Sequence, residues 1–170
     1  MSNSTSKGTA LITGASRGIG AVYADRLAKR GYDLILVARS KATLQALAAS
    51  LSSATGRHII PIVADVNNKL DLAKVEAKLK NDQNITMLVN NAGFASVAPL
   101  LEADIRKMQD MIALNVTALT RLTYAAAVTL FSSAIAANVI RRFKSTWRSF
   151  SRRMVIMFIM HGPHARRTHL

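Results

Sequence analysis

Three glycines follow a short apolar run near the start of the chain. They lie in the segment Thr13-Gly14-Ala15-Ser16-Arg17-Gly18-Ile19-Gly20, which leads into a stretch of helical periodicity. Glycine permits a tight turn and lets the backbone approach a pyrophosphate, whose negative charge then meets the free N–H groups at the positive end of a helix. A plain structural turn needs glycine too. The position of the segment, between a buried strand and an amphipathic helix, nevertheless favours dinucleotide binding.

The elements around this segment alternate between short apolar runs and helical stripes, from residue 9 to about residue 90. Four strands are predicted, at Thr9–Thr13, Asp33–Ala38, His58–Val63 and Thr86–Asn90. Apolar strands separated by helices are typical of a parallel sheet. Pro61 cannot donate to a central ladder, so the third strand belongs at an edge, as the strand order 3-2-1-4 requires. The sequence therefore predicts an α/β fold, with a doubly wound, Rossmann-like parallel sheet and flanking helices.

The helices are predicted from apolar residues at helical spacing. The stripes between the strands are Ile19, Val22, Tyr23 and Leu27, then Leu44, Leu47, Ala48 and Leu51, then Leu72, Val75 and Leu79. A helix around Ile105, Met108 and Ile112 leads into a longer one at about Asn115–Ala137, with Leu119, Leu122, Ala126 and Leu130 on one side. After this helix the pattern fades, with Met154–Met160 as a possible strand or short buried segment, so we expect the fold to be truncated after about its fourth strand and fifth helix. An open sheet edge and an uncovered helix face would then favour self-association.

Further motifs follow the glycine segment in a fixed order. Asp65-Val66 comes after the third strand, Asn90-Asn91-Ala92-Gly93 ends the fourth, and Asn115 lies in the helix beyond. With these motifs the sequence resembles the short-chain dehydrogenase/reductase family over residues 9 to about 125. In that family the Asp-Val pair contacts adenine, the Asn-Asn-Ala-Gly segment borders the nicotinamide ribose, and the helix asparagine supports the active-site water and lysine.

The resemblance implies a set of site residues and a reaction. The predicted cofactor-binding residues are Gly14, Ser16, Arg17, Gly18, Ile19, Gly20, Arg39, Asp65, Val66, Asn91, Ala92 and Gly93. The predicted catalytic residue is Asn115. The family's reaction is hydride transfer between a nicotinamide cofactor and a small carbonyl or alcohol substrate. Family members commonly pair through their long central helices, which makes a homo-oligomer a further expectation.

The charge after the second strand predicts which cofactor binds. An acid about 20 residues past the glycines would bind the ribose 2′-hydroxyl of NAD, whereas an arginine there accommodates the 2′-phosphate of NADP. Here Arg39 follows the second strand, and Arg17 lies inside the glycine segment. Both could equally be solvated surface charges, as most arginines are. We expect NADP(H) to be preferred over NAD(H) through charge-assisted contacts.

The family's proton donor is a tyrosine in Tyr-x-x-x-Lys, where the lysine charge lowers the pKa of the phenol. The residues four positions after Tyr23, Tyr32 and Tyr124 are Leu27, Leu36 and Val128, so none of these tyrosines forms the pair. Residues 137–140 could begin a fifth strand that leads to Ser145 as the family's substrate-orienting serine. The basic residues between them, however, suit a buried strand poorly. We therefore expect the chain as written to be inactive.

Composition separates two segments that meet near residue 140. Eight of the 23 Lys and Arg residues lie in residues 138–170, which hold none of the 9 acids, so more than half of the net charge of +14 falls there. We assign residues 1–140 to an incomplete NAD(P)-binding domain and residues 141–170 to a basic tail of uncertain structure. The tail histidines His161, His164 and His169 have no acid or cysteine near them, so no metal site is predicted.

The chain contains no cysteine, and its first eight residues lack the apolar stretch of a targeting signal. Because the late apolar run Met154–Met160 is too short to span a bilayer, we expect a cytoplasmic protein with no membrane partner. An NADP-dependent oxidoreductase is the leading function. A noncatalytic dinucleotide-binding or interaction module stays open. Nucleic-acid binding through the tail, where basic residues alternate with Phe143, Trp147 and Phe150, is the least favoured.

Overall fold

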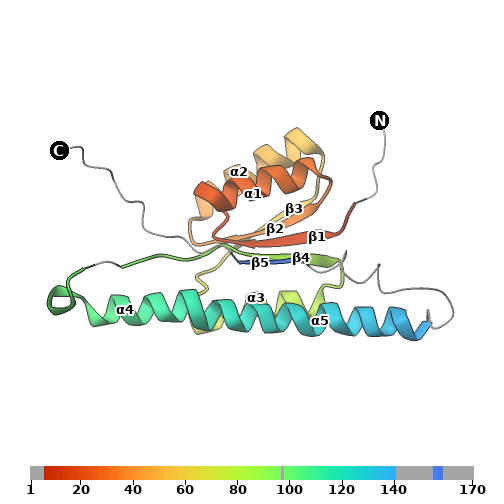
Figure 1. Cartoon of the computed structure of the whole chain (residues 1–170). Coiled ribbons are helices and arrows are strands. Elements are labelled where there is room, and N and C mark those ends of the chain that lie inside the picture. Colours follow the sequence, from red (N-terminus) through yellow and green to blue (C-terminus); the bar gives the residue numbers. More distant parts are fainter. Residues whose placement is uncertain (1–5, 97, 141–154, 159–170) are drawn as a thin grey trace, which may run out of the picture.

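The computed structural model describes residues 6–96, 98–140 and 155–158, which form one parallel sheet with its helices. The strands are β1 Thr9–Thr13, β2 Asp33–Ala38, β3 Ile59–Val63, β4 Ile85–Asn90 and β5 Val155–Phe158. They lie in the order β3-β2-β1-β4-β5 (Figure 1). The predicted order of the first four strands is confirmed. Pro61 lies in the edge strand β3, in register with Leu36 of β2.

Helices cover both faces of this sheet. Their bounds are α1 Gly18–Lys29, α2 Lys41–Thr55, α3 Lys69–Asn81, α4 Ile105–Ile112 and α5 Leu119–Ile140. Figure 1 shows α1 and α2 on one face and α3 and α5 on the other. A π-helical turn at Ala113–Ala118 joins α4 to α5, so that these form one long helix, and a short 3-10 helix at Leu100–Glu102 precedes it. This long helix extends beyond the sheet in Figure 1.

The sheet is buried on both faces because successive side chains of each strand point to opposite sides. Ala10 and Ile12 of β1 join the hydrophobic core under α1 and α2, whereas Leu11 joins the core that includes α3 and α5. In β2, Leu36 and Val37 divide between the two cores in the same way. Packing on both sides fixes the carboxyl ends of the central strands next to one another, and the loops that follow them meet at this edge.

One predicted helix face, that of α1, is wrong in only two of its four members, because Leu27 is buried and Tyr23 packs against the core. α1 buries Gly20, Ala24 and Leu27, whereas Ile19 and Val22 are exposed. The small residues let α1 lie close to the sheet, and apolar periodicity, which gives weight to large side chains, does not detect them. The next two predicted stripes are confirmed by the burial of Leu44, Ala48 and Leu51 in α2 and of Leu72, Val75 and Leu79 in α3.

The sequence predicted that the sheet ends at its fourth strand, but the sheet continues with a fifth. β5 pairs in parallel with β4, with Met87 opposite Val155 and Asn90 opposite Phe158. The predicted start of a fifth strand at residues 137–140 is wrong, because α5 continues to Ile140. The strand comes from the apolar run Met154–Met160, inside the predicted tail. It covers the β4 edge that we expected to stay open.

The long helix carries apolar side chains on two sides. Leu122 and Ala126 are buried against the rest of the fold, while Ile105 and Ile112 of the predicted helix α4 are exposed. By length and composition the helix Ile105–Thr129, whose most apolar window of 18 residues has a mean hydropathy of 1.3, is apolar enough to cross a membrane. Core helices of soluble proteins pass the same test. The burial of Leu122 and Ala126 accounts for part of this apolar character.

Candidate cofactor-binding site

A cleft of about 540 Å³ opens at the carboxyl edge of the sheet, where the loops after the first four strands meet. Open α/β sheets bind ligands at this edge. The lining residues are Gly14, Ser16, Arg17, Val37, Ala38, Arg39, Ser40, Ala64, Asp65, Val66, Asn67, Ala92, Gly93, Phe94 and Leu114. Eight of the twelve predicted cofactor-binding residues are among them. The cleft therefore brings together residues from all the predicted motifs except Asn115.

The other four predicted residues lie elsewhere. Gly18 and Ile19 line a separate depression along α1. Gly20 is buried behind the glycine turn, where a Cβ atom would collide with the Gly14 carbonyl and the side-chain amide of Asn91. Asn91 is buried as well. The structure thus gives Gly20 and Asn91 a part in shaping the turn.

The glycine turn leaves helix N–H groups available to a ligand. Gly14 and Gly18 have φ angles of 66° and 57°, a backbone region that favours glycine. α1 begins at Gly18, and neither a capping side chain nor an acidic residue occupies its first turn in the described structure. At α3, by contrast, the Asn68 side chain caps the first turn. An anionic group at the start of α1 would be stabilised by these N–H groups and by the helix dipole.

Thr13 and Asn91 join the carboxyl ends of β1 and β4. The Thr13 hydroxyl accepts hydrogen bonds from the backbone N–H groups of Asn91 and Ala92, both at 3.0 Å, and it lies 3.4 Å from the Val89 carbonyl, to which it donates. The Asn91 side-chain amide donates to the carbonyls of Thr13 and Gly14 at 3.0 and 3.1 Å. Sequence reasoning did not predict this role for Thr13. Its only sequence signal is its place as the last strand residue before the glycine turn.

Two arginines give one end of the cleft its positive charge. Arg17 comes from the glycine turn and Arg39 from the loop after β2, and both are exposed. The Arg39 guanidinium lies 4.0 Å from the carboxylate of Asp65, which follows β3. The sequence predicted all three residues for the site, but it did not predict that Arg39 and Asp65 face each other.

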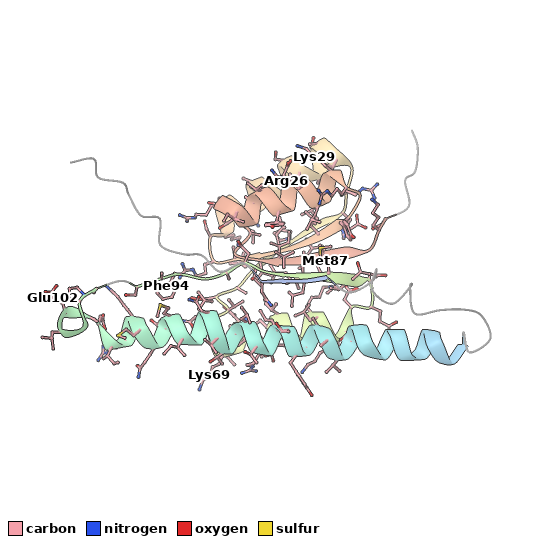
Figure 2. The ribbon with its side chains drawn as sticks, in the orientation of Figure 1. Arg26, Lys29, Lys69, Met87, Phe94 and Glu102 are labelled. Atoms are coloured by element: carbon pink, nitrogen blue, oxygen red, sulfur yellow. The ribbon has the colours of Figure 1, made fainter. Side chains whose placement is uncertain are left out.

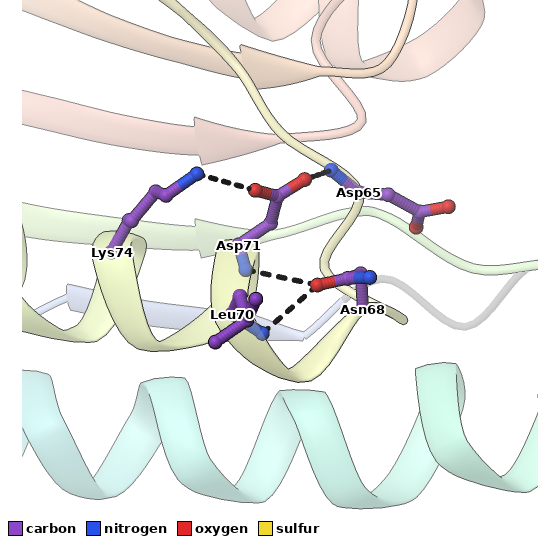
Figure 3. A network of polar contacts seen from close by, with 5 residues as sticks. All are labelled: Asp65, Asn68, Leu70, Asp71 and Lys74. Atoms are coloured by element: carbon purple, nitrogen blue, oxygen red, sulfur yellow. Dashed lines mark hydrogen bonds and ion pairs between the residues drawn. The ribbon is translucent and has the colours of Figure 1, made fainter.

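A polar network at the start of α3 holds the loop after β3 (Figure 3). The Asp71 carboxylate accepts hydrogen bonds from Lys74 Nζ at 2.9 Å and from the Asp65 backbone N–H at 3.1 Å. The Lys74 ammonium, together with that N–H group, holds the pKa of Asp71 below its usual value. Asn68 Oδ1 accepts from the N–H groups of Leu70 and Asp71 at 2.9 and 3.2 Å. The α3 terminus therefore sets the position of Asp65 in the cleft.

Asn67 lines the cleft beside Asp65 and was not predicted. Its Oδ1 atom is buried and has no hydrogen-bond partner among the described residues. Buried acceptors normally have a donor, so a ligand that brings an N–H group to this point would satisfy the amide. The free helix N–H groups, the two arginines and this acceptor together fit a dinucleotide, which carries phosphates and an aromatic amino group.

Asn115 lies in the π-helical turn and contacts the loop after β4. Its Nδ2 donates to the Phe94 carbonyl at 2.8 Å, and its Oδ1 accepts from the Phe94 N–H at 3.2 Å. Figure 2 shows Phe94 beyond the carboxyl end of β4. Asn115 thus fixes the backbone of a cleft-lining residue without lining the cleft itself. Its catalytic role stays a prediction.

Other candidate groups are not brought together. Within residues 6–96, 98–140 and 155–158, no three His, Asp or Glu side chains gather in a way that could hold a metal ion. Ser145, the tail histidines and the tail aromatic residues Phe143, Trp147 and Phe150 lie outside the described residues.

An open parallel sheet with a glycine turn after its first strand and a cleft at its carboxyl edge defines a Rossmann-like, dinucleotide-binding class of protein. The sequence model for short chain dehydrogenases matches residues 8–141. The chain belongs to this family.

Curated relatives include reductases of 3-oxoacyl-CoA. The very-long-chain 3-oxoacyl-CoA reductase of Coccidioides immitis is 37% identical over 119 residues, which are 67% of this chain and 34% of the relative. The reductase of the same name from Candida albicans is 33% identical over 128 residues, 73% of this chain and 36% of the relative. The chain spans about a third of the length of these curated relatives.

Solved structures of the family superpose on most of the chain. The bulky-bulky ketone specific alcohol dehydrogenase from Comamonas testosteroni has a TM-score of 0.74 and 42% identity, over 76% of this chain and 52% of that one. A short-chain dehydrogenase from Sphingobium yanoikuyae, in complex with NADPH, has a TM-score of 0.73 and 47% identity, over 74% of this chain and 50% of that one. The predicted fold class is confirmed by these similarities.

Proposed function

We propose that this chain forms the NADP(H)-binding part of an oxidoreductase. The observation that carries the proposal is the convergence of Arg17, Arg39 and the uncapped glycine turn on one cleft. Arg39 stands at the end of β2, where an acid would favour NAD. The complex of the similar Sphingobium protein with NADPH supports the same cofactor.

The residues of the cleft have separate roles in this proposal. The N–H groups at the start of α1 receive the pyrophosphate charge, and Arg17 and Arg39 meet the 2′-phosphate. The hydrogen bonds of Thr13 and Asn115 keep the loop that ends at Phe94 in place. When bound, NADPH supplies the hydride that reduces a carbonyl carbon. The chain's own contribution is to bind and orient the cofactor.

The first prediction is that NADPH binds more tightly than NADH, and that Arg39→Gln removes most of the difference. A charge-assisted contact contributes about 1.5 to 3 kcal/mol, so one arginine can provide roughly ten- to hundred-fold preference. Titration of both cofactors, followed by nicotinamide fluorescence, measures the ratio. Arg106→Gln, which changes an exposed arginine of α4 outside the cleft, is the matched control. Equal affinities of the unmodified chain for the two cofactors would contradict the proposal.

For the substrate we propose a small carbonyl or alcohol compound. The names of the relatives, a 3-oxoacyl-CoA reductase and a ketone specific alcohol dehydrogenase, support a carbonyl group as the reacting centre. A cytoplasmic location and a homo-oligomer belong to the same proposal.

A noncatalytic dinucleotide-binding module is the second candidate, and the missing Tyr-x-x-x-Lys pair favours it. General acid catalysis typically contributes about 10² to 10⁴-fold, and the chain as written has no tyrosine with a lysine four residues later. The second prediction is that this 170-residue chain binds NADPH but oxidises it no faster than background with ketones, aldehydes and quinones. Turnover that survives purification and is lost in Asn115→Ala would contradict this and establish the enzyme.

A further inference from the structure

The sheet itself places Arg39 and Asp65 next to each other. β2 and β3 are neighbours whose last paired residues are Ala38 and Val63, and the ladder continues with a hydrogen bond from the Ala64 N–H to the Ala38 carbonyl at 3.1 Å. Arg39 and Asp65 each come directly after this last contact. Their charged groups are 4.0 Å apart across the end of the cleft. The strand register therefore places the two residues next to each other, within reach of an ion pair.

Two hydrogen bonds fix the position of Asp65. The Asp65 backbone N–H donates to the Asp71 carboxylate at 3.1 Å, and the Asp65 Oδ1 atom accepts from the Asn67 N–H at 3.0 Å. Asp71 is in turn held by Lys74, as Figure 3 shows. The remaining carboxylate oxygen, Oδ2, is the one that faces Arg39. A fixed anion therefore stands at one end of the cleft.

Arg39, in contrast, can exchange Asp65 for another anionic partner. Its side chain is 80% exposed, against 41% for Asp65, and Asp65 is its only ion-pair partner among the described residues. Exposed ion pairs contribute little, so a ligand group of higher charge can draw Arg39 away. A phosphate carries nearly two negative charges near neutral pH, whereas a ribose hydroxyl carries none.

We propose that Asp65 is a specificity-determining residue that competes with the 2′-phosphate of the cofactor for Arg39. The inference rests on the proposed binding of NADP(H) and concerns the size of the cofactor preference. When NADPH binds, Arg39 exchanges the Asp65 carboxylate for the 2′-phosphate, so that breaking the ion pair lowers the net gain from the phosphate contact. When NADH binds, the Arg39–Asp65 pair stays intact. Asp65 therefore lowers the affinity for NADPH relative to the affinity for NADH.

The test compares adenosine nucleotides that differ only in the 2′-phosphate. Calorimetric titration of 2′,5′-ADP and 5′-AMP, and of NADPH and NADH, gives two affinity ratios for the unmodified chain, Asp65→Asn, Arg39→Gln and the double variant. We expect Asp65→Asn to raise both ratios about two- to five-fold, the range for an exposed ion pair. Any direct contact of Asp65 with the shared adenosine acts on both ligands and cancels in the ratio. In the Arg39→Gln background the effect of Asp65→Asn should shrink to little or nothing.

Asp25→Asn is the matched control, because Asp25 is 40% exposed and forms an ion pair with Lys29 on α1. It changes the net charge equally but should leave both ratios unchanged. Should Asp65→Asn fold poorly by circular dichroism, Asp65→Ser keeps an acceptor for the Asn67 N–H and removes the charge. Ratios that are unchanged in Asp65→Asn, or that rise as much without Arg39, would overturn the inference while leaving cofactor binding intact. An unmodified chain that binds none of the four nucleotides would overturn the proposed function, and this inference with it.

Discussion

The Thr13 hydroxyl replaces backbone acceptors of the sheet at the point where β1 turns away from β4. The pairing of β1 with β4 ends at Ile12 and Val89, and beyond it the chain turns at Gly14. The N–H groups of Asn91 and Ala92 would then have no strand partner, and the Thr13 hydroxyl accepts both. A buried donor left without an acceptor is costly, so one hydroxyl secures the start of the loop that lines the cleft.

Thr13→Val tests this role, because valine has nearly the same shape and lacks the hydroxyl. We expect the free energy of unfolding to fall by about 2 to 4 kcal/mol, since each buried donor left without a partner costs about 1 to 3 kcal/mol. Urea denaturation followed by circular dichroism measures the loss. Thr13→Ser should restore most of the stability, and Thr129→Val, which removes an exposed hydroxyl bond on α5, should change little. An effect of Thr13→Val as small as that of Thr129→Val would show that water replaces the hydroxyl.

The sequence motifs correctly predicted most of the residues that line the cleft. The glycines, Arg39 and Asp65 stand directly after buried strands, and parallel strands end at a common edge, so their convergence could be predicted. The contacts that each side chain makes could not be predicted. Nothing in the spacing separates Asn91, which supports the turn, from Ala92, which lines the cleft. The orientation of Asp65 toward Arg39 depends on Asp71, six residues later in the sequence.

At the scale of elements, α3 links folding to the cleft through its first turn. Asp71 bonds the Lys74 ammonium and the Asp65 N–H, and these contacts lower the pKa of its carboxyl from the ordinary 3.8. A lowered pKa in the folded state means that the contacts stabilise the fold fully above the unfolded-state value. This contribution is lost as the pH falls through the lower, folded-state value.

Asp71→Asn should therefore destabilise the fold near neutral pH and have much less effect in acid. We expect the difference in unfolding free energy between the unmodified chain and this variant to be largest at about pH 6 and to shrink below about pH 4. Urea denaturation at several pH values gives the difference. Lys74→Met, which removes the ammonium but keeps the Asp65 contact, should show a smaller difference with the same sign. A difference that does not vary with pH would mean that Asp71 acts through packing alone.

The strands were predictable because a buried parallel strand leaves a short, apolar run between helices, and four such runs match β1 to β4 within one residue at either end. The fifth strand was only one of two interpretations of residues 154–160, a possible strand or a short buried segment. Residues 137–140 are apolar apart from Asn138 but continue the helical pattern of α5, and β5 comes from a run flanked by basic residues. Local pattern gives no information on whether such a run reaches the sheet.

For the whole molecule, the long helix presents an apolar stripe away from the sheet. Its exposed members are Ile105, Ile112, Val116, Tyr124 and Val128. Tyr124 comes nineteen residues after Ile105, whereas five turns of α-helix take about eighteen. The π-helical turn at Ala113–Ala118 takes up the extra residue, so that the stripe stays on one side of the helix. Exposed apolar side chains gathered on one side of a helix are a candidate interaction site.

We expect the chain to self-associate through this stripe, in line with the homo-oligomer predicted from the family. Sedimentation velocity over a concentration series should give a mass above that of the monomer. Replacing Ile112 and Tyr124 together by glutamate should return the mass to that of the monomer, because charged groups across a close apolar contact are expensive to bury. Both side chains are exposed, so the thermal unfolding midpoint and the NADPH affinity should stay the same. Leu70→Glu, at an exposed leucine of α3 outside the stripe, should not alter the mass. An unmodified chain that is monomeric at every concentration would show that the stripe does not mediate pairing in this chain.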